Sequence, residues 1–240
     1  MNTRTITIRA MVVCLIAVFA AKSEGQTLLQ TVSNSVADGT LVMDGSRSDW
    51  NGLTPFNTDP NEGSTQDWSV VTIANDTSNF YFRYQFNATT GLDASAMIFL
   101  DTNNSRLSGY TGGSDQFPIG AEYMIQGASI YGYTGSGTDW SWDNYLGGVN
   151  YDTSVTNDFE FSLAQSTIGS ISTFSFVLFS QGTVGGSYYE DYYPDSANQG
   201  ASGGYFAYTT VPEPGTNMLI LGGLGMLVGG GRYLRRRQEA

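Results

Sequence analysis

The sequence contains no histidine, and its single cysteine is Cys14. The absence of histidine excludes Ser-His-Asp and Cys-His catalysis and every zinc site that uses a histidine ligand. Because Cys14 lies in an N-terminal segment that we expect to be removed, the rest of the chain can form neither a disulfide nor a thiol site. A domain without disulfides must be stabilised by side-chain packing or by a bound metal ion.

Basic residues are scarce between residues 26 and 210. Of the 22 acidic residues in the chain, all but three lie in this region, which therefore carries 19 carboxylates, three arginines and a net charge of −16. The arginines are Arg47, Arg83 and Arg106. Because such a surface repels phosphate backbones, we expect no nucleic-acid partner. The region is long enough for one domain with its own core.

The first 25 residues have the composition of a secretory signal peptide. Two arginines supply positive charge, and residues 10–21 form an apolar run of 12 residues, which is too short to span a bilayer. Small residues at positions 23 and 25 predict cleavage before Gln26. A buried helix is the alternative, but the basic start and the position in the chain favour a signal peptide.

A short apolar segment followed by arginines ends the sequence. Residues 215–231 carry no charge, and as a helix they would extend ~25 Å, slightly less than the ~30 Å hydrocarbon core of a bilayer. Seven glycines in this run argue against a permanent single-pass anchor, which is the alternative interpretation. The arginines that would hold this end in the cytoplasm are Arg232, Arg235, Arg236 and Arg237.

The motif Val211-Pro212-Glu213-Pro214 directly precedes the apolar segment. Together with the arginine cluster, this arrangement resembles the PEP-CTERM sorting signal of Gram-negative bacteria. The resemblance implies export, transient membrane insertion through residues 215–234, and cleavage by an exosortase that leaves the protein at the cell surface or in the extracellular matrix. Such systems are associated with exopolysaccharide, which is therefore a candidate partner. The predicted organisation is a signal peptide at 1–25, a domain at 26–210 and a sorting signal at 211–240.

The central region favours short β-strands separated by turns. Residues 79–86 alternate regularly and place four aromatic side chains, at positions 80, 82, 84 and 86, on one face. Turn-forming residues 75–78 join this strand to the one before it, and residues 95–100 form an apolar run typical of a strand buried on both faces. This pattern predicts an all-β fold, an antiparallel β-sandwich, with a barrel as the alternative. We expect strands at residues 69–74, 79–86, 95–100, 121–126, 129–134, 159–163, 174–180 and 205–210.

Several short motifs follow one another between about residues 40 and 195. They are Asp44-Gly45 with Asp49-Trp50, Ile73-Ala74-Asn75-Asp76 before Asn79-Phe80-Tyr81-Phe82, Phe99-Leu100-Asp101-Thr102-Asn103, Gly120-Ala121-Glu122-Tyr123, Phe159-Glu160, and Asp191 with Pro194-Asp195. In this order they resemble the β-sandwich of carbohydrate-binding-module family 9, often grouped with DOMON-like domains. Ala164 and Glu122 depart from the pattern, in which proline and aspartate are usual. The resemblance implies the fold more strongly than a sugar ligand.

Oxygen-bearing side chains alternate at Asp101, Asn103 and Ser105. This spacing is typical of a loop that wraps a hard cation such as Ca²⁺. Arg106 stands where an EF-hand requires glycine, which excludes that motif. Glu122 could add a fourth ligand if the neighbouring strands pair, and the family resemblance also implies a structural calcium near these positions. The alternative is an Asx-rich turn that satisfies its own backbone.

Aromatic and acidic residues alternate in Asp139-Trp140-Ser141-Trp142-Asp143. On a strand, Trp140 and Trp142 would share one face ~7 Å apart, where they could stack on successive sugar rings. Asp139 and Asp143 are close enough to accept hydrogen bonds from sugar hydroxyl groups. Core packing of both indoles is the alternative. A second aromatic group lies at Tyr188-Tyr189 and Tyr192-Tyr193.

Asp158 and Glu160 lie two residues apart on a predicted strand. A glycosidase uses two carboxylates ~5–9.5 Å apart, but we favour a solvated strand face and expect no enzymatic activity. The sequence therefore predicts a secreted protein that binds carbohydrate, specifically exopolysaccharide, without catalysis. The alternative is a structural biofilm-matrix protein without a small-molecule ligand.

Overall fold

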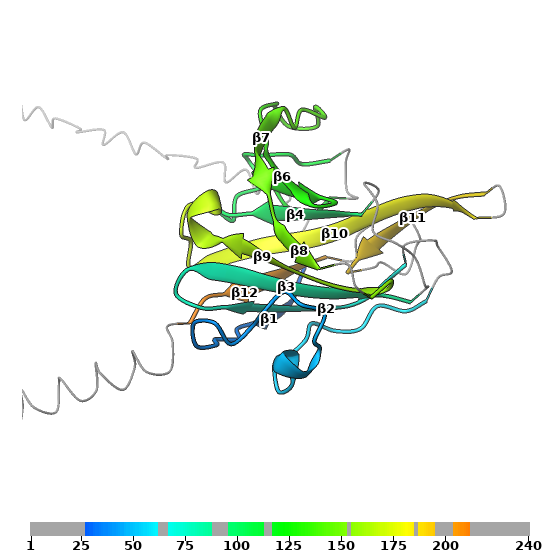
Figure 1. Ribbon diagram of the computed structural model, residues 1–240. Helices are drawn as coiled ribbons and strands as arrows, with labels where there is room; N and C mark the ends of the chain where they lie inside the picture. The colour runs from blue at the N-terminus through cyan, green and yellow to red at the C-terminus, as the bar shows by residue number, and fades with distance from the viewer. Residues whose placement is uncertain are drawn as a thin grey trace, which may run out of the picture.

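The computed structural model describes residues 27–61, 67–87, 96–112, 117–152, 155–184, 187–194 and 204–211 (Figure 1). These residues form β-strands and short 3₁₀ turns, and no α-helix occurs among them. Within this part of the chain, no helix is therefore long and apolar enough to cross a membrane. The predicted signal peptide and the predicted sorting helix lie outside the described residues.

Two packed sheets confirm the predicted β-sandwich (Figure 1). The eight-stranded sheet has the order β1 (Leu28–Val32), β12 (Tyr205–Thr209), β10 (Thr173–Val184), β4 (Met97–Asp101), β5 (Tyr123–Gln126), β6 (Ser129–Gly132) and β7 (Asn144–Gly148), and β11 (Ser187–Tyr193) pairs with β10. The four-stranded sheet has the order β2 (Trp68–Asn75), β3 (Asn79–Phe86), β9 (Asp158–Ala164) and β8 (Asn150–Asp152). These strand pairs are antiparallel except for β1 with β12, which is parallel.

The hairpin of β2 and β3 forms as its sequence predicts. The four aromatic side chains at even positions of β3 are all buried, because the two-residue period of a strand places them together on the face toward the other sheet. In the turn, the Asp76 carboxylate accepts hydrogen bonds from the backbone N–H groups of Ser78 and Asn79, both at 2.7 Å. This Asx turn satisfies backbone donors where the chain reverses.

Aromatic side chains fill the space between the two sheets. Phe82 of β3 and Phe161 of β9 stack with ring centroids 4.7 Å apart, and Phe80 meets Phe174 of β10 edge to face at 5.2 Å. Such pairs contribute ~0.5–1.5 kcal/mol each beyond the burial of their area. Other large buried side chains of this core are Phe56, Trp68, Phe159, Phe176, Tyr193 and Tyr208.

Each sheet also carries apolar side chains on its outer face. The chain before β2 packs Val36, Leu41 and Trp50 against Ala74 and Tyr81 of the four-stranded sheet. A further cluster covers the outer face of the eight-stranded sheet around the middle of β4. All five residues of β4 are therefore buried, which confirms the prediction of a strand covered on both faces.

Candidate functional site

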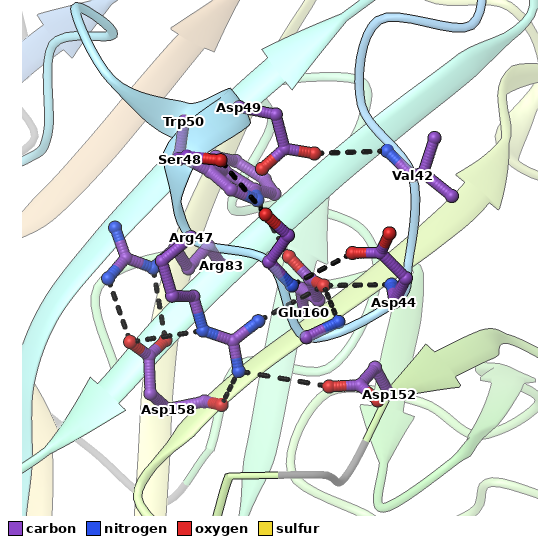
Figure 2. A network of polar contacts seen from close by, with 12 residues as sticks. Val42, Asp44, Arg47, Ser48, Asp49, Trp50, Arg83, Asp152, Asp158 and Glu160 are labelled. Atoms are coloured by element: carbon purple, nitrogen blue, oxygen red, sulfur yellow. Dashed lines mark hydrogen bonds and ion pairs between the residues drawn. The ribbon is translucent and has the colours of Figure 1, made fainter.

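A cluster of charged side chains lies on the outer face of the four-stranded sheet (Figure 2). At its centre Glu160 of β9 is 0% exposed. Its Oε1 accepts hydrogen bonds from the backbone N–H groups of Asp44 and Gly45, at 3.0 and 2.6 Å. Its Oε2 accepts one from the indole Nε1 of Trp50 at 2.7 Å. The carboxylate thereby holds residues 44–50 against the sheet.

Two arginines complete this charged cluster. Arg83 of β3 donates to both oxygens of Asp158, from Nε at 3.0 Å and from Nη2 at 2.7 Å. Arg47 lies 3.2 Å from Asp158 through Nε and 3.0 Å from Glu160 through Nη1. Its Nη2 is 3.8 Å from Asp152 of β8. Opposite charges thus surround the buried carboxylates, as ionised groups withdrawn from water require.

The prediction of a solvated face at Asp158 and Glu160 is wrong, because these residues are 6% and 0% exposed. Their side chains do point away from the aromatic core, as strand alternation requires. However, the chain before β2 folds over that face and buries them. The Asp44-Gly45 and Asp49-Trp50 motif therefore attaches this chain segment to β9 through hydrogen bonds to Glu160.

The predicted calcium loop follows β4 and lies beside Glu122. The Glu122 N–H donates to the Leu100 carbonyl at 3.0 Å, which fixes the position of Glu122 next to the loop. Its carboxylate accepts hydrogen bonds from the Thr102 N–H at 2.8 Å and from the Asn103 amide nitrogen at 2.5 Å. Glu122 and Asn103 are therefore in direct contact, but through the Asn103 amide nitrogen, whereas calcium would be bound by oxygen atoms.

Asp101 supplies a second carboxylate at this loop and is 3% exposed. Its Oδ1 accepts a hydrogen bond from the Ser105 N–H and its Oδ2 one from the Gly120 N–H, both at 3.3 Å. Burial, and after it the charge of Glu122, raises the pKa of Asp101 above its usual value. A bound cation would instead favour the ionised form of both carboxylates.

These residues fit the donor set of calcium in part. Two carboxylates and one amide gather at the loop, but the Ser105 hydroxyl accepts a hydrogen bond from the Leu107 N–H at 3.4 Å. Among the described residues, no group of three or more acidic, histidine or cysteine side chains is arranged to hold a metal. Calcium therefore stays a prediction, with Asp101, Asn103 and Glu122 as its main candidate ligands.

The two tryptophans of residues 139–143 differ in exposure. Trp140 is 56% exposed, whereas Trp142 is 7% exposed and belongs to the cluster on the outer face of the eight-stranded sheet. The prediction of a shared strand face is wrong, because residues 139–143 lie in the connection between β6 and β7 and form no strand. The two ring centroids are 6.1 Å apart with an angle of 70° between the planes. Trp140 is therefore the exposed aromatic side chain of the pair.

Neighbouring aromatic rings contact one side of the Trp140 indole. Its ring meets that of Tyr110 edge to face at 5.4 Å. The Tyr133 hydroxyl donates to the Asp139 carbonyl at 3.0 Å, which fixes the chain just before the indole. Asp139 and Asp143 are both exposed. The loop thus combines one exposed indole with two exposed carboxylates.

The tyrosines of β11 do not form a second shared surface. Tyr188 is 60% exposed, but Tyr192 is 8% and Tyr193 is 0% exposed. Tyr193 belongs to the core and donates its hydroxyl to the Asn57 carbonyl at 2.5 Å. The Tyr189 side chain lies outside what the structure describes.

A pocket of about 140 Å³, which the sequence analysis missed, lies beside the loop after β4. Its walls come from the end of β4, the following loop, residues 118–119, β10 and β12. No local sequence pattern signals such a set, because the pairing of β10 with β4 and β12 assembles it. The polar residues of the lining are Asp101, Asn104, Arg106, Ser175 and Tyr205.

A substitution at Glu160 tests whether the charged cluster stabilises the fold. Glu160→Gln should lower the free energy of unfolding by about 3–5 kcal/mol, because it removes the buried charge that faces Arg47 and accepts hydrogen bonds from Gly45 and Trp50. Urea denaturation followed by tryptophan fluorescence measures the change. Asp143→Asn is the control, because Asp143 is exposed, and it should change stability by no more than about 0.5 kcal/mol. A Glu160→Gln protein as stable as the wild type would contradict the role.

Comparison with protein families identifies the C-terminal segment. Residues 210–237 match the family described as PEP-CTERM protein-sorting motif, which confirms the resemblance of this segment to such a signal. A search of curated proteins finds no match to the chain. Because the family covers the tail and not the β-sandwich, the resemblance of the domain to carbohydrate-binding-module family 9 stays a prediction.

The sorting motif begins where the described domain ends. The Val211 N–H donates to Asn75 Oδ1 at 3.4 Å, and Asn75 Nδ2 donates to the Val211 carbonyl at 3.2 Å. The remaining predicted sorting residues lie outside the described residues; they are Pro212, Glu213, Pro214, Arg232, Arg235, Arg236 and Arg237. The matched motif implies that the protein is exported, processed by an exosortase and sorted to the cell surface.

Proposed function

We propose that the β-sandwich domain binds exopolysaccharide at the cell surface without catalysis. The observation that carries this proposal is the indole of Trp140, which is 56% exposed and held against Tyr110. A ring that its neighbours already orient loses little conformational entropy when a sugar stacks on it. The exposed carboxylates of Asp139 and Asp143 can accept hydrogen bonds from the sugar hydroxyl groups.

The sorting of the protein supports the same function. The PEP-CTERM motif directs the chain to the cell surface, and exosortase systems are associated with exopolysaccharide. The net charge of −16 in residues 26–210 favours a neutral polysaccharide over an acidic one, because like charges repel.

A structural matrix protein without a small-molecule ligand is the second candidate. Trp142 favours it, because this indole is buried and packs 5.0 Å from the ring of Tyr133. Such a side chain stabilises the fold and offers no open face to a sugar. Under this alternative, the acidic surface would hydrate the matrix.

Replacement of each tryptophan separates the two candidates. Trp140→Ala should abolish retention on exopolysaccharide from the native host in affinity electrophoresis, and it should leave thermal melting nearly unchanged because the indole is exposed. Trp142→Ala should cost ~3–5 kcal/mol of folding stability, as truncation of a buried aromatic side chain does.

The matched control is Tyr145→Ala, because Tyr145 is 60% exposed on β7, outside the loop that carries Trp140. This variant should be retained like the wild type. If the Trp140→Ala protein is also retained like the wild type, the exposed indole does not bind the polysaccharide, and the structural matrix protein becomes the preferred candidate.

We also propose that calcium stabilises the loop after β4. Its candidate ligands are Asp101, Asn103, Ser105 and Glu122. Added calcium should raise the melting temperature, because an ion that binds only the folded state stabilises it by ~2.7 kcal/mol at a hundredfold excess over its Kd. Glu122→Gln should remove this increase. Identical melting curves of the wild type in millimolar calcium and in chelator would rule the ion out.

Finally, we propose that the surface form of the protein ends close to the sorting motif. Residues 215–231 are short and glycine-rich for a permanent anchor, and Val211 is held in the folded domain by Asn75. Mass spectrometry of protein from the native host should therefore find a C-terminus between Val211 and Gly215. Surface-localised protein that still ends at Ala240 would show that the tail is retained.

A further inference from the structure

The loop between β6 and β7 places the exposed indole of Trp140 between two carboxylates. Trp140 is 56% exposed, and Asp139 and Asp143 on either side of it are exposed as well. The Ser141 hydroxyl donates to Asp143 Oδ2 at 3.0 Å, which holds this carboxylate beside the residue that follows the indole. Burial, and after it the charge of Asp139, raises the pKa of the Tyr133 hydroxyl, so Asp139 lies near the rings beneath the loop. An indole and two negative charges are therefore exposed together on one loop.

Backbone hydrogen bonds fix this loop in place. The Thr134 N–H donates to the Ser141 carbonyl at 3.0 Å, which closes the loop on itself. The Thr111 N–H donates to the Gly137 carbonyl at 2.9 Å, which attaches the loop to a second segment of the chain. Because the chain itself supplies these contacts, a ligand that binds the loop does not have to order it, and less conformational entropy is lost on binding.

Positive charge is scarce in the part of the sequence that carries this loop. The domain has no lysine, and no basic residue lies between Arg106 and Arg232. Arg47 and Arg83 form ion pairs on the outer face of the four-stranded sheet, and Arg106 donates to the Phe117 carbonyl at 3.3 Å. All three arginines of the domain thus serve contacts within the fold. The loop therefore lies in a long stretch of chain that supplies negative charge and no positive charge.

The groups on this loop restrict the chemistry of the ligand. Like charge repels an acidic ligand. A neutral sugar can stack on the indole, but it gains no charge attraction from the carboxylates. A ligand with ammonium groups gains both kinds of contact, because tryptophan attracts a cation over its ring more strongly than any other side chain. An ammonium group also donates charge-assisted hydrogen bonds to a carboxylate, which are stronger than those of a hydroxyl group.

We propose that the loop between β6 and β7 binds a glycan that carries free amino groups, with a sugar ring on the Trp140 indole and its ammonium groups paired with Asp139 and Asp143. The proposal rests on the proposed function and narrows its ligand to polysaccharides whose amino sugars are not N-acetylated. An acetyl group turns the ammonium into a neutral amide and removes the pairing. The degree of acetylation of the polysaccharide therefore decides how strongly the protein is retained.

Two oligosaccharides that differ only in acetylation test the ligand class. The probes are a glucosamine hexamer with free amino groups and the N-acetylglucosamine hexamer of the same length, and isothermal titration calorimetry with the full protein measures their affinity. At about pH 5.5 the amino groups are protonated and aspartates, with a usual pKa of ~3.9, are ionised. The free-amine hexamer should bind about tenfold more tightly. This preference should shrink between ~0.1 and ~1 M salt, because the Debye length falls from ~10 to ~3 Å.

Removal of either carboxylate should reduce the preference for the free-amine hexamer. Asp139→Asn and Asp143→Asn should each weaken its binding about two- to fivefold, the loss expected for one exposed ion pair. Both variants should bind the N-acetylated hexamer within about twofold of the wild type, because an asparagine still forms hydrogen bonds with sugar hydroxyl groups. Trp140→Ala should weaken the binding of both hexamers, because each stacks on the indole.

Asp44→Asn is the matched control for the loss of one negative charge. Asp44 is exposed in the segment that covers the four-stranded sheet, outside the loop between β6 and β7. This variant should bind the free-amine hexamer within about twofold of the wild type. A hexamer of lysine controls for the glycan itself, because it carries the same number of ammonium groups and no sugar ring. It should bind more weakly than the free-amine hexamer, and Trp140→Ala should change its affinity less.

Several results would overturn the amino-sugar proposal. The free-amine hexamer fails to bind, or it binds no more tightly than the N-acetylated hexamer. Asp44→Asn weakens binding as much as Asp139→Asn, which would assign the attraction to net charge. The lysine hexamer binds as tightly as the sugar and depends on Trp140, which would replace the glycan by a basic peptide. Equal binding of both sugar hexamers, with host polysaccharide retention that still depends on Trp140, would reject the amino-sugar class and keep the proposed function. Retention and hexamer binding that are both unaffected by Trp140→Ala would reject both.

Discussion

The buried carboxylate of Glu160 is the constraint on which the four-stranded sheet and its cover depend. An ionised carboxylate withdrawn from water costs several kcal/mol unless hydrogen bonds and opposite charge replace the water. Here the replacements come from residues between 110 and 116 positions earlier in the chain. β9 therefore reaches its buried state only with residues 44–50 in place, and we infer that this sheet and its cover form together.

Periodicity in the sequence predicted the strands along which an apolar face repeats. β3 matches the predicted residues 79–86, and β9 extends the predicted 159–163 by one residue at each end. The strands β1, β7, β8 and β11 were missed. β7 shows the physical reason, because four of its five residues are exposed and two are glycine, so that no apolar face repeats along it.

Candidate sites were harder to predict, because strand periodicity says which side chains share a face and not what covers that face. Asp158 and Glu160 alternate with phenylalanines as a solvated pair would, yet Arg47 from a distant loop buries them. Trp142 is likewise buried by residues from other elements, while Trp140, two positions away, stays exposed. The pocket at Arg106 has the same origin, since strand pairing assembles its walls.

The chain leaves the domain at the end of the eight-stranded sheet that also carries the loop after β4. Thr209 at the end of β12 pairs with Thr173 at the start of β10, and Val211 follows directly. Two residues into β10, Ser175 lies opposite Asp101, which puts the pocket roughly 7 Å along the sheet from that end at ~3.4 Å per residue. The matched motif implies exosortase processing of the segment that follows the domain. The domain is therefore joined to that segment at this end of the eight-stranded sheet, beside the loop after β4, rather than at the far end of the sandwich.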